Sequence, residues 1–286
     1  MILLRKVVPR DFNLFLFGDD HEGTVFRHKE GWDQLVKMMS GRYEGLSKAH
    51  NFGVDHGDIV EAIMIDDPRY AADTVTAVPL QQIQVAIESR KPIASKMVAL
   101  LDGNHPRKLS RFGELTKHVC EKLKVPFGTY TCRITYVTED GEILFKHYAT
   151  HGSRNISSRA KPYERARTNM KIRLVDLLQD KSSDCILSSR GHSHKILIKR
   201  PTCKLELYDN GRTIKQGFSG GWPVYPSPVP EESRWYVNAG SFLKLYCDMP
   251  ISGYAEIAEY DPVELGFAVG IVRNGRITDI KKEFLE

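Results

Sequence analysis

The sequence of 286 residues has no long hydrophobic run and few cysteines. No stretch approaches the roughly 18 consecutive apolar residues of a membrane-spanning helix. The opening residues, MILLRKVVPRDF, lack the apolar core and the small-residue cleavage site of a signal peptide. The five cysteines form no CxxC pair, which argues against a disulfide framework and against a cysteine-type zinc site. These absences predict a soluble, cytoplasmic protein without a membrane partner.

Low-complexity tracts and internal repeats are also missing. Hydrophobic residues make up 41% of the chain and charged residues 27%, which excludes a disordered chain, a collagen-like repeat and a coiled coil. A chain of this length can bury about three quarters of the surface that it exposes when unfolded. We therefore expect one domain over residues 1–286 with a sizeable core. The sequence does not indicate an oligomeric state.

The net charge is small and is concentrated in one segment. The chain has 41 basic and 36 acidic residues, a net charge of +5. Between Arg154 and Lys181, eight basic residues oppose three acidic ones, and this segment alone accounts for the whole imbalance. We expect residues 154–181 to be a basic helical insertion that binds an anionic partner. The alternative is a solvated helix face.

Hydrophobic periodicity predicts alternating strands and helices, followed by a strand-rich C-terminal third. Helical spacing occurs at residues 32–39, 81–89, 111–123 and about 163–179. Strand-like runs occur at residues 13–17, 97–101, 129–138 and 143–149, with hairpin turns at Glu139-Asp140-Gly141, Asp209-Asn210-Gly211 and Asn274-Gly275. The Gly- and Pro-rich residues 217–233 are expected to form a long loop. This order favours an α/β fold with mixed sheets.

Five short motifs rich in Asp, His, Asn and Gly follow one another along the chain, most of them after an apolar run. They are Asp19-Asp20-His21, Gly57-Asp58-Ile59-Val60-Glu61, Gly103-Asn104-His105, Thr150-His151-Gly152 and Gly191-His192-Ser193-His194. Open α/β sheets gather such side chains at the carboxyl ends of their strands. Imidazole, carboxylate and amide oxygen suit first-row divalent metals. Seven candidate ligands exceed one tetrahedral ion and fit two ions about 3.5–4 Å apart that share a carboxylate.

The ordered motifs resemble those of the calcineurin-like metallophosphoesterase superfamily, whose signature is DxH, GDxx(D/E), GNH(D/E), a histidine and GHxH. The strand-like Val237-Asn238-Ala239-Gly240-Ser241 also resembles that family's segment after the last motif, so the likeness spans about residues 13–245. It implies a four-layer α/β/β/α sandwich with two mixed sheets and two divalent metals (Mn, Fe, Zn, Ni or Co, with Mn favoured). The implied ligands are Asp19, His21, Asp58 and His194 for the first metal, and Asp58, Asn104, His151 and His192 for the second, with Asp58 bridging.

The resemblance also implies a catalytic role for His105, which would contact the phosphate and assist the leaving group. Pro106 follows it where the family usually has an acid, so the group that orients His105 must come from elsewhere. Glu22 stands before Gly23 in the first motif and is a second departure, which changes the expected shape of that loop. His147 competes with His151 as a ligand, but His151 is preferred because a glycine follows it.

These observations predict a metal-dependent phosphoric ester hydrolase in which two metals lower the pKa of a bridging water from about 15.7 toward 7. A phosphodiesterase acting on nucleotides or nucleic acid is favoured, because the basic segment begins directly after His151. The candidate substrate-binding residues are Arg107, Arg154, Arg159, Lys161 and Arg165, although Arg107 also fits an ordinary surface arginine. The alternative is a phosphomonoesterase acting on small molecules or phosphoproteins. The motif GDIVEAI, however, lacks the Asp-Arg-Gly continuation of Ser/Thr protein phosphatases. A non-enzymatic scaffold is the third interpretation.

Overall fold

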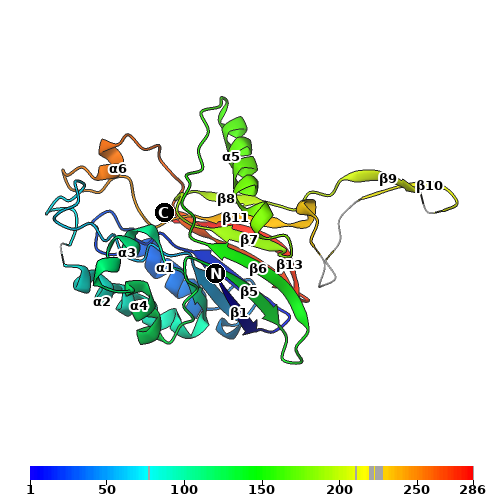
Figure 1. Cartoon of the computed structure of the whole chain (residues 1–286), viewed down its shortest axis with the longest axis horizontal. Helices are drawn as coiled ribbons and strands as arrows, with labels where there is room; N and C mark the ends of the chain where they lie inside the picture. The colour runs from blue at the N-terminus through cyan, green and yellow to red at the C-terminus, as the bar shows by residue number, and fades with distance from the viewer. Residues whose placement is uncertain (77, 210, 219–221, 223–227, 286) are drawn as a thin grey trace.

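The chain forms a mixed α/β structure, seen in a computed structural model that describes residues 1–76, 78–209, 211–218, 222 and 228–285. Those residues contain three β-sheets and six α-helices (Figure 1). The expected α/β class is therefore confirmed, and both large sheets mix parallel with antiparallel strands. In the part of the chain that is described, every helix is too short or too polar to cross a bilayer.

One large sheet has five strands in the order β13-β12-β2-β3-β4. The strands are β2 (Phe12–Phe17), β3 (Asn51–Asp55), β4 (Met97–Leu100), β12 (Gly266–Arg273) and β13 (Arg276–Phe284). Because β2, β3 and β4 are parallel neighbours, the chain leaves all three at the same edge. Every residue of β2 is buried, as expected for a strand that is covered on both faces.

The other large sheet has six strands in the order β1-β5-β6-β7-β11-β8. The strands are β1 (Ile2–Val7), β5 (Thr131–Val137), β6 (Ile143–Thr150), β7 (Leu187–Arg190), β8 (Ile196–Lys199) and β11 (Trp235–Ala239). Its central strands β6, β7 and β11 are parallel neighbours. The third sheet is a hairpin of β9 (Leu205–Asp209) and β10 (Ile214–Phe218), which extends away from the body of the molecule (Figure 1).

Helices lie against both large sheets. The six helices of the described residues are α1 (Lys29–Ser40), α2 (Pro79–Arg90), α3 (Asn104–Lys108), α4 (Leu115–Leu123), α5 (Tyr163–Leu178) and α6 (Tyr254–Ile257). Leu35, Ile83 and Val119, from α1, α2 and α4, share one apolar cluster with side chains of the five-stranded sheet. Leu174 of α5 packs with Tyr148 and other side chains of the six-stranded sheet in a separate cluster.

Alternation along β2 shows how the two sheets pack together. Phe12, Leu14 and Leu16 join a cluster that also contains side chains of the six-stranded sheet. Phe15 and Phe17 point the other way, into the cluster with the helices. Successive side chains of a strand point to opposite faces, so β2 connects the core between the sheets with the core beneath the helices. This packing fixes the edge from which the loops after β2 emerge.

Most predicted elements are confirmed, with two corrections. The helix predicted over residues 111–123 is wrong over its first part, because a short 3₁₀ turn ends at Phe112 and α4 begins only at Leu115. Gly113 between them has φ +113°, which no helix permits. In the predicted loop over 217–233, residues 217 and 218 belong to β10. Residues 219–221 and 223–227, and Asn210 of the predicted turn, lie outside the described residues.

Candidate metal centre

The five motifs lie at the carboxyl ends of five strands, mostly in loops, and Asn104 and His105 of the third motif begin α3. The first three loops follow β2, β3 and β4 of one sheet, and the last two follow β6 and β7 of the other. The backbone N–H of His192 donates to Asp19 Oδ2 at 2.8 Å and so joins the loops of the two sheets. The predicted gathering of these side chains is therefore found where the parallel strands end.

The candidate ligands form two groups whose members lie within reach of one ion. The ligand atoms of Asp19, His21 and His194 lie within 4.8 Å of one another. In this first group, His21 Nε2 is 3.2 Å from His194 Nε2, which is 3.8 Å from Asp19 Oδ1.

The second group contains Asp58, His151 and His192, again within 4.8 Å of one another. The amide oxygen of Asn104 lies 2.8 Å from His151 Nε2 and 2.7 Å from His192 Nδ1. Asp58 Oδ2 lies 3.3 Å from the same His151 nitrogen. All seven predicted ligands are thus brought together in the two sets that the resemblance implies, and Asp58 is grouped with the second set.

The chemistry of these atoms fits a bound cation. His151 Nδ1 lies 2.7 Å from the His56 carbonyl, to which it donates, so Nε2 of the neutral ring is an acceptor. That acceptor faces the oxygens of Asn104 and Asp58, which are acceptors as well. Asp19 Oδ1 is buried without a hydrogen-bond partner. Acceptors that converge in a buried space need a positive charge between them, either a proton or a metal ion.

Buried carboxylates perturb the protonation of this centre. Burial by itself lowers the pKa of His21, but the Glu61 carboxylate outweighs it and raises that pKa to about 9. His151 behaves in the same way beside Asp58, and its pKa is also raised to about 9. Burial raises the pKa of Asp19 to about 7. A metal that binds here must therefore displace protons, which makes its affinity depend on pH.

The environments of His192 and His194 favour their neutral form. Burial, assisted by the neighbouring His151, lowers the pKa of His192 to about 4. Burial, assisted by His21, holds the pKa of His194 well below its ordinary value. Neutral imidazole is the form that binds metal, so these two rings are prepared for ligation at physiological pH.

Five of the seven candidate ligands have a left-handed backbone conformation. They are Asp19 (φ +53°), His21 (+52°), Asp58 (+49°), His192 (+70°) and His194 (+53°). Residues other than glycine adopt this region rarely, at a cost of order 1 kcal/mol or more each, and such residues cluster at functional sites. Gly103 is constrained differently, since a Cβ there would lie 2.0 Å from Asp58 Oδ1.

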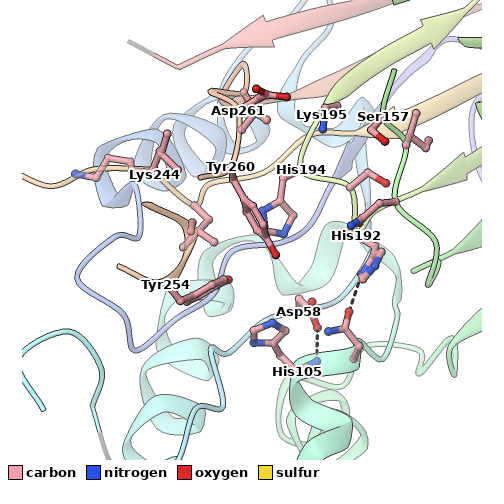
Figure 2. A pocket seen from close by; sticks show the side chains of 18 of the residues that line it. Asp58, His105, Ser157, His192, His194, Lys195, Lys244, Tyr254, Tyr260 and Asp261 are labelled. Carbon is pink, nitrogen blue, oxygen red and sulfur yellow. Dashed lines mark hydrogen bonds between the residues drawn. The ribbon is translucent and has the colours of Figure 1, made fainter. Parts of the chain in front are cut away.

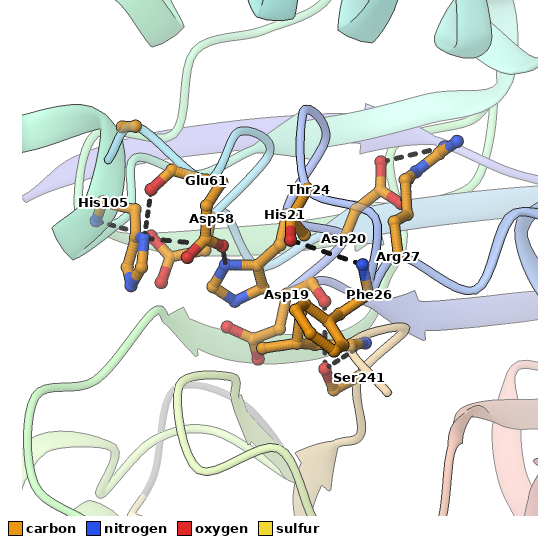
Figure 3. A network of polar contacts seen from close by, with 12 residues as sticks. Asp19, Asp20, His21, Thr24, Phe26, Arg27, Asp58, Glu61, His105 and Ser241 are labelled. Carbon is orange, nitrogen blue, oxygen red and sulfur yellow. Dashed lines mark hydrogen bonds and ion pairs between the residues drawn. The ribbon is translucent and has the colours of Figure 1, made fainter. Parts of the chain in front are cut away.

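Glu61 orients both His21 and His105, as Figure 3 shows. Its Oε2 atom lies 2.7 Å from His21 Nδ1 and 3.9 Å from His105 Nδ1, while its backbone oxygen accepts from His105 Nδ1. The backbone N–H of His105 donates to Asp58 Oδ1 at 2.8 Å. Glu61 therefore supplies the orienting group that Pro106 cannot provide. Glu61 is the last residue of the second motif, and its orienting role was not predicted from the sequence.

A buried chain of hydrogen bonds stands behind His151. His56 Nδ1 donates to the Phe17 carbonyl at 2.9 Å, so its Nε2 accepts from the Ser189 hydroxyl at 2.6 Å. Ser189 Oγ in turn accepts from His147 Nε2 at 2.6 Å. Because His56 also offers its carbonyl to His151, the chain fixes the backbone that orients this ligand. His147, the rival ligand, belongs to this network and to neither metal group.

A second buried network holds the first loop. Asp20, between the ligands Asp19 and His21, accepts from Arg90 at 3.1 Å and from Arg27 at 2.7 Å. Arg27 also pairs with Glu22 at 3.0 Å. The extra acid in the first motif is thus neutralised within the loop itself, and Arg90 is completely buried.

Two of the five predicted substrate-binding residues line a cavity near the metal centre, and three do not. Arg159 and Lys161 line a cavity beside the metal centre. The other three, Arg107, Arg154 and Arg165, line neither that cavity nor the cavity over the metal centre. The side chain of Arg107 is 60% exposed and lies 3.5 Å from Asp102.

Sequence reasoning missed several residues of the cavity over the candidate ligands. This cavity of about 430 Å³ is lined on one side by Asp58, His105 and His194, and Tyr254 and Tyr260 point into it from the segment after β11 (Figure 2). The tyrosines gave no signal, because that segment has neither a motif nor a clear periodicity. Lys195 also lines the cavity and follows directly after the last motif, which could have marked it.

Comparison with protein-family models and with curated proteins finds no match for this chain.

Proposed function

We propose that the protein is a metal-dependent phosphoester hydrolase of the calcineurin-like metallophosphoesterase type. The observation that carries this proposal is the pair of adjacent ligand groups, Asp19/His21/His194 and Asp58/Asn104/His151/His192, built from five loops in the order of that family's motifs. Helices against both large sheets support the corresponding α/β/β/α sandwich. We further propose two divalent ions, with Mn favoured.

The chemistry of such a site is phosphoryl transfer to water. When bound, two divalent ions neutralise the charge of a phosphate, polarise its oxygens and activate a water molecule at neutral pH. The protein contributes fixed ligands, since Glu61 and the His56 carbonyl orient His21 and His151 before any metal arrives. Ligands held in this way lose little entropy on binding, which favours a rigid centre.

His105 is the candidate catalytic residue beside the metals. Its Nδ1 atom donates to the Glu61 carbonyl, so its other nitrogen is free to face the cavity that it lines. Burial lowers the pKa of His105, whereas an anionic phosphate next to the ring would raise it. Substrate binding would thus favour the protonated form of His105, the form that can give a proton to the leaving oxygen.

A phosphodiester substrate is favoured over a monoester. The support is the cationic lining that extends beyond the metal centre through Lys195 to Arg159 and Lys161. A small monoester has no group that would reach those side chains. A phosphomonoesterase is the second candidate.

A Mn²⁺-supplemented activity panel tests the proposal. It compares bis-p-nitrophenyl phosphate, p-nitrophenyl phosphate and a phosphopeptide, with metal-stripped protein and Asp58→Asn as controls. Metal-dependent hydrolysis, fastest for the diester, is expected. Faster hydrolysis of both monoesters would favour the phosphatase, and an inactive protein that binds Mn²⁺ would favour a scaffold.

A further inference from the structure

A second cavity adjoins the one over the metal centre. We call the cavity that holds Asp58 and His105 the proximal cavity and its neighbour, of about 460 Å³, the distal cavity. The two share four lining residues, Ser157, Lys195, Asp261 and Val263. Figure 2 shows Ser157, Lys195 and Asp261 together, at the end away from His105. The distal cavity therefore adjoins the proximal cavity at these four residues, on the side away from His105.

The distal cavity carries an excess of positive charge. Its lining includes four cations, Arg159, Lys161, Arg167 and Lys195, and two carboxylates, Asp261 and Glu264. Arg167 and Glu264 neutralise each other at 2.7 Å. Among the described residues, neither Arg159 nor Lys161 forms an ion pair. Two cations of the distal cavity are therefore left without an ion-pair partner.

Lys195 occupies the junction of the two cavities. It follows the candidate ligand His194 directly and lines both cavities. Its side chain is only partly exposed to solvent, and Asp261 is the one carboxylate that lines both cavities with it. A partly desolvated cation gains more from an anionic ligand than an exposed one does. The phosphate next to the scissile one would be such an anionic ligand for Lys195.

Each cavity is also lined by an exposed aromatic side chain. Tyr260, which is 57% exposed, lines the proximal cavity, and Tyr163, which is 61% exposed, lines the distal one. Cationic grooves with accessible aromatic rings are typical of proteins that bind single-stranded nucleic acid, because the rings stack on unpaired bases. The bases of a duplex are stacked on one another and offer no free face to such rings.

We propose that the two cavities form a binding groove for single-stranded nucleic acid. The scissile phosphate lies at the metal centre, Lys195 binds the adjacent phosphate, and Arg159 and Lys161 bind the phosphates beyond it. Tyr260 and Tyr163 stack on bases. This inference rests on the proposed phosphodiesterase function and specifies the form of its substrate.

Binding without hydrolysis tests the groove. Fluorescence anisotropy in EDTA measures the affinity of a labelled dodecathymidylate and of the same strand paired with its complement. The single strand should bind more tightly. Lys195→Ala and the double variant Arg159→Ala/Lys161→Ala should weaken its binding, and the slope of log affinity against log salt should fall by about 0.7 for each lost phosphate contact. Tyr163→Ala should cost roughly fivefold or more in affinity.

Matched controls distinguish binding in the groove from a general effect of the protein's positive charge. Arg173→Ala/Lys181→Ala removes the same charge from exposed positions of the same basic segment, outside both linings, and should change affinity little. Lys195→Arg should retain binding, which shows that a loss in Lys195→Ala comes from charge and not from misfolding. Equal losses in the control and groove variants, or equal affinity for single strand and duplex, would overturn the inference.

The same preparations distinguish this inference from the proposed function. If single strands bind selectively but no phosphodiester is hydrolysed with Mn²⁺, the hydrolase proposal fails and the groove stands. If bis-p-nitrophenyl phosphate is hydrolysed while the groove variants bind dodecathymidylate as the wild type does, the groove fails and the hydrolase stands.

Discussion

Individual residues of the candidate centre combine strain with unsatisfied polar atoms. Five ligands have positive φ, and Asp19 Oδ1 is buried with no partner. Features of this kind lower the stability of the folded chain, and proteins retain them mainly at sites where a ligand compensates. The strained ligands belong to three of the five motifs, those that follow β2, β3 and β7.

Asp58 is the residue whose loss should affect the metals most. Asp58→Asn should remove metal from both groups if it bridges them, whereas Asn104→Ala should weaken only the group containing His151 and His192, which it contacts. Metal analysis after dialysis against Mn²⁺ gives the number of ions per chain. A wild-type protein that saturates at one ion per chain would contradict a two-metal centre.

Replacing His105 should lower the reaction rate without changing the amount of bound metal. His105→Ala should keep both ions and lower the rate about 10²–10⁴-fold, the usual contribution of a proton-transfer group. The loss should shrink for aryl esters with good leaving groups, since these need no proton. A loss that is equal across leaving groups would assign His105 to phosphate binding instead of proton donation.

At the scale of elements, the sequence predicted β2, β4 and β6 among the strands that precede the ligands, but neither β3 and β7 nor the cavity walls. Apolar runs before Asp19 and Asn104 mark β2 and β4 because the signal is local. Tyr254 and Tyr260 reach the site only through tertiary packing of a segment that lies more than 50 residues beyond the last motif. The early start predicted for α4 has a local cause as well, because Phe112 fits the helical period but Gly113 interrupts it.

The hydrogen-bonded chain of His56, Ser189 and His147 should make stability depend on pH. Burial lowers the pKa of His56 to about 4 and holds that of His147 well below its ordinary value. In the unfolded chain both rings take up protons near pH 6.5. Stability is therefore fully present above pH 6.5 and falls as the pH drops toward 4, by up to about 1.4 kcal/mol per pH unit for each ring.

Urea denaturation of metal-free protein at pH 7 and pH 5 measures this dependence. His147→Gln removes one titrating ring and should flatten the change between the two pH values, although it also lowers stability at pH 7. His118→Gln, at an exposed position of α4, serves as the control and should leave the dependence as in the wild type. An unchanged dependence in His147→Gln would show that this ring is not held neutral.

At the scale of the whole molecule, the centre lies where two sheets meet. Its ligands come from loops on both sheets, and Asp19 and His192 already join these loops. A cation bound by both groups would therefore act as a cross-link between the two halves of the core. The strand orders of the sheets could not be derived from the sequence, because pairs such as β2 with β12 join residues more than 250 positions apart.

Metal binding should consequently stabilise the entire fold. A ligand that is present at about 100 times its dissociation constant adds roughly 2.7 kcal/mol to the free energy of unfolding, which corresponds to a rise of several degrees in Tm for a chain of this size. Differential scanning calorimetry of EDTA-stripped and Mn²⁺-loaded protein measures the shift. Asp58→Asn should show a smaller one, and identical melting of the two wild-type samples would contradict binding across the sheets.

The stacking of Trp32 gives the protein a built-in optical reporter. The indole ring is buried, with the guanidinium groups of Arg90 and Arg27 at 4.4 Å and 5.4 Å from its centre. Both arginines pair with Asp20, which lies between two candidate ligands. Movement of that loop on metal binding would therefore shift two positive charges relative to the indole, and the colour and intensity of its ultraviolet emission depend on such charges.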